Sequence, residues 1–275
     1  MPTPDKIIEY QKNAVNNKAK QEAWEHVRTL RSAVDFTRMN LPPIDWLVPG
    51  LIAPGLTTIA GQSKAGKSWF LLQLGLSVSA GGVFIGNIRC KKADVLYFAL
   101  EDQDRRIISR IDKLGIPATR NLYIDTSNKV TPQNINPILD ELPSIQMIII
   151  DTLGRYLENE GIDSNDYNEM TKAAGQMHTL AKERNIAVIV CTHTRKEADK
   201  HDWLDGVMGS KALVAVSDTI LKLSRQRETT EGKLQVTGRD VEERTIEMEH
   251  TYDWLWYDKN ADFSSPIEEF EQWQG

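Results

Sequence analysis

The sequence is poor in cysteine, in long apolar runs and in excess charge of either sign. Among its 275 residues only Cys90 and Cys191 are cysteines, too few for a disulfide framework or a zinc site built from cysteine. No uncharged apolar run reaches the roughly 18 residues that a membrane span needs. The N-terminal residues lack an apolar core behind a basic start, which disfavours a secretory signal. Together these absences predict a cytoplasmic globular protein with no membrane partner.

The charge balance is mildly acidic, with 33 Lys and Arg against 39 Asp and Glu and a formal net charge of −6. This balance excludes a wholly basic protein that wraps nucleic acid, but a local basic loop stays compatible with phosphate binding. Apolar residues make up 40% of the chain and charged residues 26%, which is ordinary for a folded protein. The length predicts one large domain or two small ones.

Three regions follow one another along the chain. Residues 1–45 are expected to be a helical extension and linker, because the apolar residues of Asp5–Thr37 are only loosely periodic and prolines follow. Their helices are expected to be exposed and to pack on a neighbouring subunit, the alternative being a mobile solvated segment. Residues 46–260 are expected to form the core. Residues 261–275 are expected to be an acidic tail with a final short helix.

Within the core, short β-rich runs alternate with helical stretches. This alternation predicts an α/β fold, with a mostly parallel sheet flanked by helices on both faces. The predicted parallel strands are Leu56–Ala60, Val95–Ala99, Leu122–Ile124, Met147–Ile150, Ala187–Cys191 and Thr219–Leu223. The main predicted helices are Lys67–Ala80, Gln103–Leu114 and Ser164–Asn185. Three closely spaced runs predict antiparallel strands at the C-terminal edge of the sheet: Lys233–Thr237, Arg244–Met248 and Asp253–Tyr257.

The most specific motif is the segment from Gly61 to Ser68, which matches the phosphate-loop (P-loop) pattern G-x-x-x-x-G-K-[ST] in full. A predicted strand precedes it and a helix follows, so that backbone N–H groups and the helix start can bind phosphate oxygens. Lys67 is expected to reach the β and γ phosphates, and the Ser68 hydroxyl to ligate Mg²⁺. The predicted nucleotide-binding residues are Gly61, Gln62, Ser63, Lys64, Ala65, Gly66, Lys67, Ser68 and Trp69.

Two later strands end in acidic residues, at the sheet edge where α/β proteins bind ligands. Asp151 is expected to hold Mg²⁺ opposite Ser68, the alternative being a cap for a following helix. Glu101 is expected to polarise the water that attacks the γ-phosphate. Asp102 is an equal candidate for the N-cap of the next helix. In the alternative interpretation, Glu101 and Asp102 are ordinary surface acids.

The order of these elements, strand–phosphate loop, strand–Glu and strand–Asp, resembles the RecA-like P-loop ATPases. Within that class, the chain is most similar to the hexameric replicative helicases of the plasmid RepA type. The resemblance covers residues 40–258. The segments that carry it are Gly61–Ser68, Leu100–Asp102, Ile150–Tyr156, Cys191–His193, Gly209–Ser210 and Thr237–Asp240.

The resemblance implies a homo-oligomer, a hexameric ring that binds ATP and Mg²⁺ between adjacent subunits. It also implies that His193 senses the γ-phosphate from a strand end. An arginine of the neighbouring subunit would stabilise charge on the transferring phosphoryl group. Arg239 matches this role best, with Arg225 and Arg227 as alternatives. The implied catalytic residues are Lys67, Glu101, His193 and Arg239.

In proteins of this type two loops face the central channel and hold single-stranded DNA. Here they correspond to residues 154–166 and 194–206. Cationic side chains would neutralise phosphates, and an aromatic ring would stack on a base. The implied DNA-binding residues are Arg155, Arg195, Lys196, Lys200 and Trp203. Because acidic residues of the second loop offset its cations, an ordinary solvated loop is an equal alternative.

The sequence therefore leads to the hypothesis of an ATP-hydrolysing oligomeric motor on single-stranded DNA, a replicative helicase of RepA type. The alternative is a RecA-like regulatory or loader ATPase that binds ATP and a protein or DNA partner without unwinding a duplex. The acidic charge balance favours this alternative. A small-molecule kinase is disfavoured, because the sequence shows neither an arginine-rich lid nor an acceptor pocket.

Overall fold

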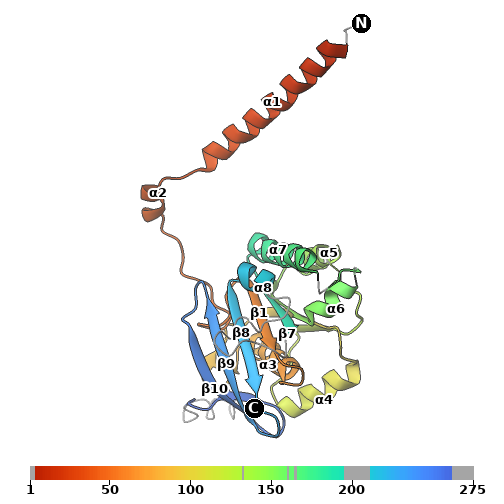
Figure 1. The fold of residues 1–275 in the computed structure, drawn as a ribbon. Coiled ribbons are helices and arrows are strands. Elements are labelled where there is room, and N and C mark those ends of the chain that lie inside the picture. The colour runs from red at the N-terminus through yellow and green to blue at the C-terminus, as the bar shows by residue number, and fades with distance from the viewer. Residues whose placement is uncertain (1–3, 132, 160, 164–165, 195–210, 262–275) are drawn as a thin grey trace. The chain divides into compact units, whose positions relative to one another are not determined.

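The computed structural model describes residues 4–131, 133–159, 161–163, 166–194 and 211–261. The chain divides into two compact units, Met1–Ile44 and Asp45–Gly275. The first unit contains α1 (Pro4–Thr29) and α2 (Ala33–Thr37), and the second contains all the other described helices and strands (Figure 1).

The N-terminal unit has no core of its own among its described side chains, because none of them is buried. A capping box starts α2: the Ser32 hydroxyl accepts from the N–H of Asp35, and the Asp35 carboxylate accepts from the N–H of Ser32. Large apolar side chains are left uncovered along the two helices and between them: Trp24, Val27, Leu30, Val34 and Phe36 are 53–69% exposed. Their role as a contact for a neighbouring subunit stays a prediction.

One sheet of nine strands forms the centre of the second unit, in the order β11-β10-β9-β8-β1-β7-β6-β4-β5. The strands that pair in parallel are β1 (Gly55–Gly61), β4 (Asp94–Ala99), β5 (Leu122–Asp125), β6 (Ile145–Asp151), β7 (Ala187–His193) and β8 (Thr219–Arg225). Beyond β8 the antiparallel strands are β9 (Glu231–Gly238), β10 (Arg244–His250) and β11 (Trp256–Asp258). The predicted fold class is confirmed.

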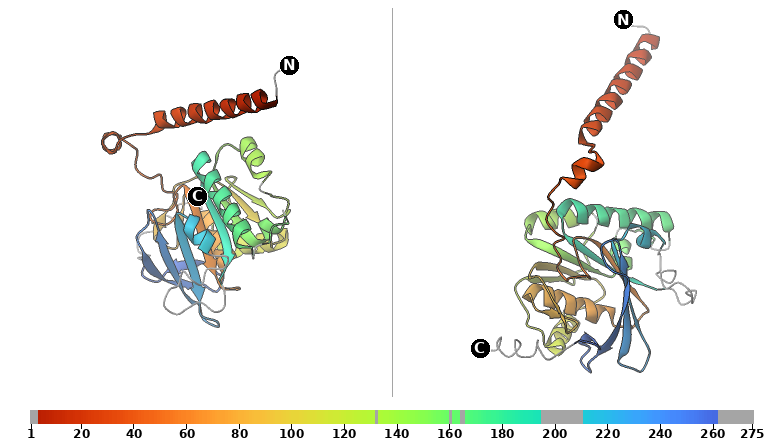
Figure 2. Two further views of the ribbon diagram at one scale, coloured as in Figure 1. Left: turned by 45° about the horizontal axis from the view of Figure 1, so that its top comes forward. Right: turned by 90° about the vertical axis from the view of Figure 1, so that its left-hand side faces the viewer.

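Helices cover both faces of this sheet (Figure 2). On one face lie α3 (Lys67–Ala80) and α4 (Asp104–Leu114); on the other lie α5 (Ile135–Glu141), α6 (Leu153–Glu158), α7 (Tyr167–Arg184) and α8 (Lys211–Val216). Because successive side chains of a strand point to opposite faces, β6 contributes to both cores. Met147 and Ile149 pack in the core beneath α3, and Ile148 and Ile150 pack in the core beneath α7.

Several element boundaries differ from the predicted ones. Helix α7 begins at Tyr167 rather than at Ser164, because the Asp166 carboxylate accepts from two backbone N–H groups and caps it there. The last predicted strand, Asp253–Tyr257, is wrong in its first half, where a turn closes with the N–H of Trp254 donating to the carbonyl of Thr251. The strand itself is β11.

Helix α5 and a small hairpin, β2 (Val83–Phe84) with β3 (Ile88–Arg89), have no counterpart in the sequence prediction. The predicted C-terminal helix lies outside the described residues, which end at Ala261. Among the described helices, none combines the length and the hydrophobicity that crossing a membrane requires.

Candidate nucleotide site

The phosphate loop joins β1 to α3, and two of its glycines are required by close packing. A Cβ on Gly61 would lie 2.3 Å from the carbonyl oxygen of Leu223 in the neighbouring strand β8. Gly66 has a φ of +98°, and a Cβ there would meet the rings of Trp254 and Trp256 at 3.0 Å. Glycine avoids both clashes and accepts the positive φ at low cost. The loop is therefore packed closely against β8 and against Trp254 and Trp256.

Lys67 lies under the loop with only 6% of its surface exposed. Its Nζ donates to the carbonyl oxygens of Gly61 at 2.8 Å and Gln62 at 3.0 Å, and lies 3.3 Å from Nδ1 of His193. His193 ends β7 and pairs in register with Gly61. Burial and the Lys67 charge lower the pKa of His193. The imidazole is therefore neutral at pH 7, and its Nδ1 can accept from the ammonium group.

Asp151 ends β6 and is 3% exposed. Its carboxylate accepts hydrogen bonds from the hydroxyl of Tyr97, at 2.9 Å, and from the side chains of Ser68 and Cys191. Burial raises the pKa of Asp151, although these hydrogen bonds oppose the shift. The contact between the Ser68 hydroxyl and the Asp151 carboxylate brings together two oxygen donors of the kind that Mg²⁺ prefers next to phosphates. These residues fit a magnesium ion.

Glu101 follows β4 and is linked to the end of β6 by one hydrogen bond. The hydroxyl of Thr152 donates to Oε1 of Glu101 at 2.8 Å. Thr152 also accepts from the N–H of Arg155 and caps α6. Thr152, rather than Asp151, is thus the helix cap, which leaves Asp151 free to act at the site. The exposed Glu101 carboxylate is held beside the buried one in a position where it can accept a proton from water.

Asp102 has a different role from the one that the sequence suggested. The N-cap of α4 is Gln103, so the prediction that Asp102 caps this helix is wrong. Its carboxylate is 6% exposed and forms ion pairs with Arg106 and Arg110, one and two turns along α4. These two ion pairs attach α4 to the end of β4. Glu101 is the acid that remains available.

Two of the three candidate arginines lie beside the phosphate loop of their own subunit. Arg225 ends β8, and its Nη2 donates to the carbonyl oxygen of Lys64 at 3.1 Å. Arg225 and Arg227, together with loop residues 62–65, line a cavity of about 250 Å³. This placement gives both side chains access to a nucleotide bound by the same subunit.

Arg239 lies at the opposite edge of the sheet. Its neighbour Gly238 pairs with Thr219, the first residue of β8, whereas the phosphate loop follows the last residue of β1. Nη1 of Arg239 contacts Oδ1 of Asp218 at 2.9 Å. Strand β8 runs parallel to β1, so that the first residues of the two strands lie at the same edge of the sheet. Arg239 lies near this edge and the phosphate loop lies at the other, one strand length away. In the described part of the chain, Arg239 is thus held by Asp218, away from the phosphate loop.

The regions expected to bind DNA are described only in part. Residues 153–158 form α6, so the first predicted loop, residues 154–166, is wrong in its first five residues. Arg155 is exposed on this helix and pairs with Glu158 at 2.7 Å. The remaining predicted residues lie outside the described part of the chain: Arg195, Lys196, Lys200 and Trp203, together with the predicted helix start at Gly209–Ser210.

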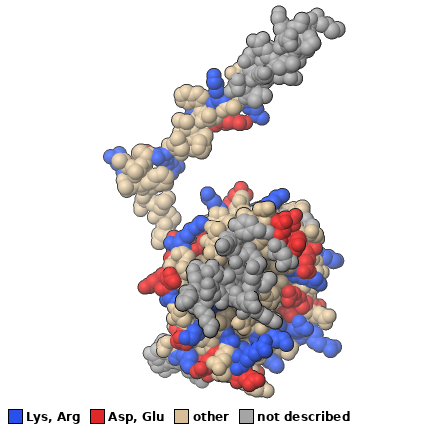
Figure 3. Space-filling model, viewed as in Figure 1, with Lys and Arg blue, Asp and Glu red and all other residues tan. Residues whose placement is uncertain are grey.

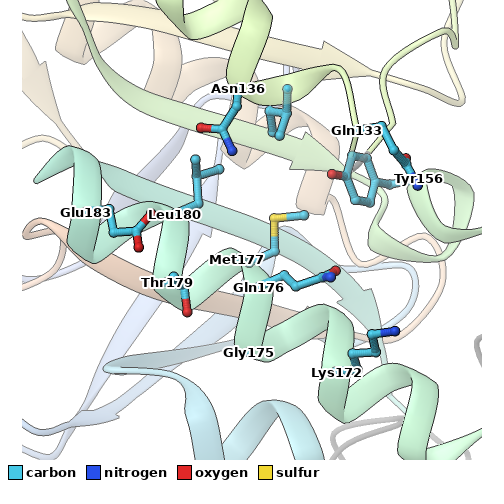
Figure 4. A pocket seen from close by; sticks show the side chains of 11 residues that line it. Gln133, Asn136, Tyr156, Lys172, Gly175, Gln176, Met177, Thr179, Leu180 and Glu183 are labelled. Atoms are coloured by element: carbon cyan, nitrogen blue, oxygen red, sulfur yellow. The ribbon is translucent and has the colours of Figure 1, made fainter. Parts of the chain in front are cut away.

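A larger cavity, of about 530 Å³, lies away from the phosphate loop between α5, α6 and α7. Asn136, Tyr156, Met177 and Leu180 are among its lining side chains (Figure 4). It contains none of the catalytic or nucleotide-binding residues predicted from the sequence. The volume of a cavity therefore does not identify the nucleotide site in this protein. The site is identified by the charged and hydroxyl groups that converge at the phosphate loop.

The sequence prediction missed two side chains that touch the site, Tyr97 and Thr152. A signal for Tyr97 was present, since it lies two residues before Ala99, which pairs with Asp151, and the two-residue period of a strand puts both on one face. The signal for Thr152 was its position directly after Asp151. The bond from Thr152 to Glu101 joins two strand ends and has no sequence signature.

Comparisons with known proteins agree with this geometry. The pattern of the AAA domain family matches residues 25–199. DNA repair protein RadA of Streptococcus pneumoniae is 26% identical over 203 residues, which are 72% of this chain and 42% of RadA. DNA repair protein RAD57 of Saccharomyces cerevisiae is 27% identical over 179 residues, 56% of this chain and 37% of RAD57. The chain thus spans about two fifths of the length of these curated relatives.

Two solved structures share the fold. A DnaB-like replicative helicase superposes with a TM-score of 0.57 at 16% identity, covering 72% of this chain and 56% of that helicase. The RadB recombinase superposes with a TM-score of 0.53 at 17% identity, covering 76% of this chain and 92% of RadB. At these identities the likeness establishes the RecA-like fold.

Proposed function

This chain belongs to the AAA domain family, and from that premise we propose that it is an ATPase that works as an oligomeric motor on single-stranded DNA. The more specific form of the proposal is a replicative helicase of RepA type. The observation that carries it is the convergence of Lys67, Ser68, Glu101, Asp151 and His193 at one edge of the sheet. The fold shared with a DnaB-like replicative helicase supports it.

Each group has a distinct part in hydrolysis. Lys67 and the loop N–H groups bind the phosphates, and Ser68 with Asp151 would hold Mg²⁺, which neutralises charge on the β and γ phosphates. Glu101, oriented by Thr152, accepts a proton from the attacking water. His193 lies beside Lys67 and is placed to respond to the γ-phosphate.

We propose that the site is completed by a second copy of the chain. Arg239 cannot reach its own loop, and the uncovered apolar residues of α1 and α2 offer a surface for a neighbour. In a ring, each subunit would supply Arg239 to the adjacent site, where it stabilises charge on the transferring phosphoryl group. The number of subunits, six in the resemblance, belongs to this proposal.

A regulatory or loader ATPase is the second candidate. Its support is that the curated relatives are DNA repair proteins and that charge is mixed over the surface. On the face drawn in Figure 3, Lys and Arg lie among Asp and Glu rather than in one continuous basic field over the described residues. Such a protein would use ATP to act on a protein or DNA partner without separating strands.

ATP turnover with and without single-stranded DNA tests the first proposal. We expect stimulation of about tenfold or more, equivalent to about 1.4 kcal/mol off the barrier, and lower stimulation as salt rises.

Glu101→Gln should bind ATP like the wild type and lose turnover. Release of a strand from a forked duplex would support the helicase. Turnover that ignores DNA at low salt, with no strand release, would favour the loader.

A further inference from the structure

A stack of aromatic rings borders the phosphate loop at Gly66. The indole of Trp254 lies parallel to His250, with centroids 4.4 Å apart and planes 5° apart, and to Trp69, at 5.9 Å and 11°. The guanidinium carbon of Arg225 lies 5.0 Å from the centroid of the Trp254 ring. Trp254 therefore makes the stacked and cation–π contacts that an aromatic ligand would make with the same neighbours.

The strand order puts the Trp254 end of this stack on the side of the loop where the proposed nucleotide would carry its base. Glu101, Asp151 and His193 follow β4, β6 and β7, on one side of β1, and so define the γ-phosphate end of the site. Arg225 and the Trp254 turn belong to β8–β11, on the other side. A nucleotide with its γ-phosphate toward the acids points its ribose and base in the opposite direction, past Gly66 and toward Trp254.

Three polar atoms near the stack are buried without a hydrogen-bond partner in the described part of the chain: Nε of Arg225, Nε2 of His250 and Nε1 of Trp256. His250 is only 7% exposed, and its Nδ1 already bonds to the carbonyl oxygen of Thr251 at 2.8 Å. Buried polar atoms without partners reduce stability, so their concentration at one place needs an explanation. Such a concentration is consistent with a ligand site, where a polar group of the ligand or a water supplies the partners.

The turn that carries Trp254 is under local strain. Trp254 has a φ of +67°, a conformation that is unfavourable for a bulky residue. The chain beyond it is firmly held, because the buried Gln73 side chain donates to the carbonyl of Trp256 at 2.7 Å and accepts from its N–H at 2.9 Å. The end of β10 at His250 and the anchored Trp256 thus hold the two ends of the turn at residues 251–255.

We propose that Arg225 and His250 form the base-binding part of the nucleotide site and that Trp254 is its exchangeable occupant. The inference rests on the proposed binding of ATP. A purine base takes the place of the indole beside the Arg225 guanidinium and the His250 imidazole, and the turn at residues 251–255 swings out. Trp254 thus competes with the base but not with the phosphates. Because stacking reads the face of a ring, adenine and guanine compete with Trp254 to a similar extent.

The test separates the base from the phosphates by comparing two probes, a non-hydrolysable ATP analogue and inorganic tripolyphosphate, both with Mg²⁺. Trp254→Ala should bind the analogue about fivefold more tightly or better, since the stacking and cation–π contacts no longer compete. Its affinity for tripolyphosphate should stay unchanged. Tyr252→Ala is the matched control, because Tyr252 lies in the same turn and is 95% exposed; it should alter neither affinity.

A second measurement does not depend on the alanine variant. In protein labelled with 5-fluorotryptophan, the ¹⁹F signal of Trp254, assigned with Trp254→Phe, should move on addition of the analogue and stay in place with tripolyphosphate. Weaker or unchanged analogue binding by Trp254→Ala, or an equal change for both probes, overturns the inference. If the wild type binds neither probe, the proposed function fails, and the inference fails with it.

Discussion

At the scale of single residues, Asp151 is a carboxyl group whose proposed function and whose burial favour different protonation states. Its carboxyl group lies at the end of a buried strand, where loss of water raises its pKa. A raised pKa in a folded carboxyl group means that the ionised form is disfavoured by folding. The proposed magnesium site needs that ionised form. A bound Mg²⁺ would favour the ionised form, which burial alone disfavours.

Replacement of Asp151 by asparagine should separate these two effects. In the folded wild type the pKa of Asp151 lies above its ordinary value of 3.8. At a pH between 3.8 and the folded pKa, Asp151 is therefore protonated more often in the folded protein than in the unfolded chain. Wild-type stability contributed by this group therefore falls as pH rises through the folded pKa. Asp151→Asn should raise the free energy of unfolding at pH 7, with a smaller gain near pH 4, and should lower ATP turnover about a hundredfold or more.

Urea denaturation at the two pH values and an ATPase assay check this prediction. Asp112→Asn is the control, since Asp112 is exposed on α4 and the same change there should leave both stability and turnover nearly unaltered. A less stable Asp151→Asn protein at pH 7 would show that the hydrogen bonds from Tyr97 and Ser68 outweigh the burial of charge.

The site residues that could be predicted are those whose signal is local in sequence. Lys67 and Ser68 are letters of one motif, and Glu101 and Asp151 are the polar ends of apolar strands. Asp102 was misassigned because its partners, Arg106 and Arg110, become neighbours only through the helical period of α4. The placement of Arg225 beside its own loop depends on the pairing of β8 with β1, which no short pattern encodes.

At the scale of elements, long amphipathic or fully apolar segments were predictable, and short ones were not. Helix α3 was predicted from its first residue to its last, since the loop motif fixes its start and Gly81 in the left-handed region ends it. Helix α5 and the β2–β3 hairpin are too short for a period to show. Their positions are set by packing against the sheet rather than by their own sequence.

The attachment of β11 to α3 gives a prediction at this scale. Gln73 is 2% exposed and makes two hydrogen bonds to the backbone of Trp256. Gln73→Ala leaves a buried N–H and a buried carbonyl without partners, which should cost about 2–4 kcal/mol of unfolding free energy. Ser79→Ala on the same helix, where the lost bond is local to the helix, should cost about 1 kcal/mol or less.

Urea denaturation of both variants measures the difference. Equal losses for Gln73→Ala and Ser79→Ala would mean that the edge strand is held by Trp256 packing alone. The result also bears on the base site, because an anchored Trp256 holds one end of the turn at residues 251–255.

At the scale of the whole molecule, the two edges formed by the ends of the parallel strands carry different groups. One carries the phosphate loop and the acids, and the other carries Arg239, ion-paired with Asp218. A single copy cannot bring the two edges together. The sequence could suggest Arg239 only through family resemblance, because the distance between the edges emerges from the antiparallel return of β9 along β8.

Mixing two inactive variants tests whether the arginine acts between subunits. Lys67→Ala removes the phosphate ligand, and Arg239→Ala should bind nucleotide normally but lose turnover; each protein alone should be inactive. In a mixture that exchanges subunits, an Arg239→Ala subunit offers an intact loop and a Lys67→Ala neighbour offers an intact arginine. With random equal mixing, about one quarter of the interfaces should be complete and ATP turnover should reappear.

A mixture that stays inactive despite subunit exchange, or a fully active Arg239→Ala, would refute the assignment of Arg239. Loss of activity in Arg225→Ala alone would then point to an arginine that acts within one subunit, because Arg225 already contacts the Lys64 carbonyl of its own loop. The mixing experiment therefore distinguishes Arg239 from Arg225. A Lys67→Ala subunit can supply an arginine to its neighbour's site only if that arginine acts across the interface.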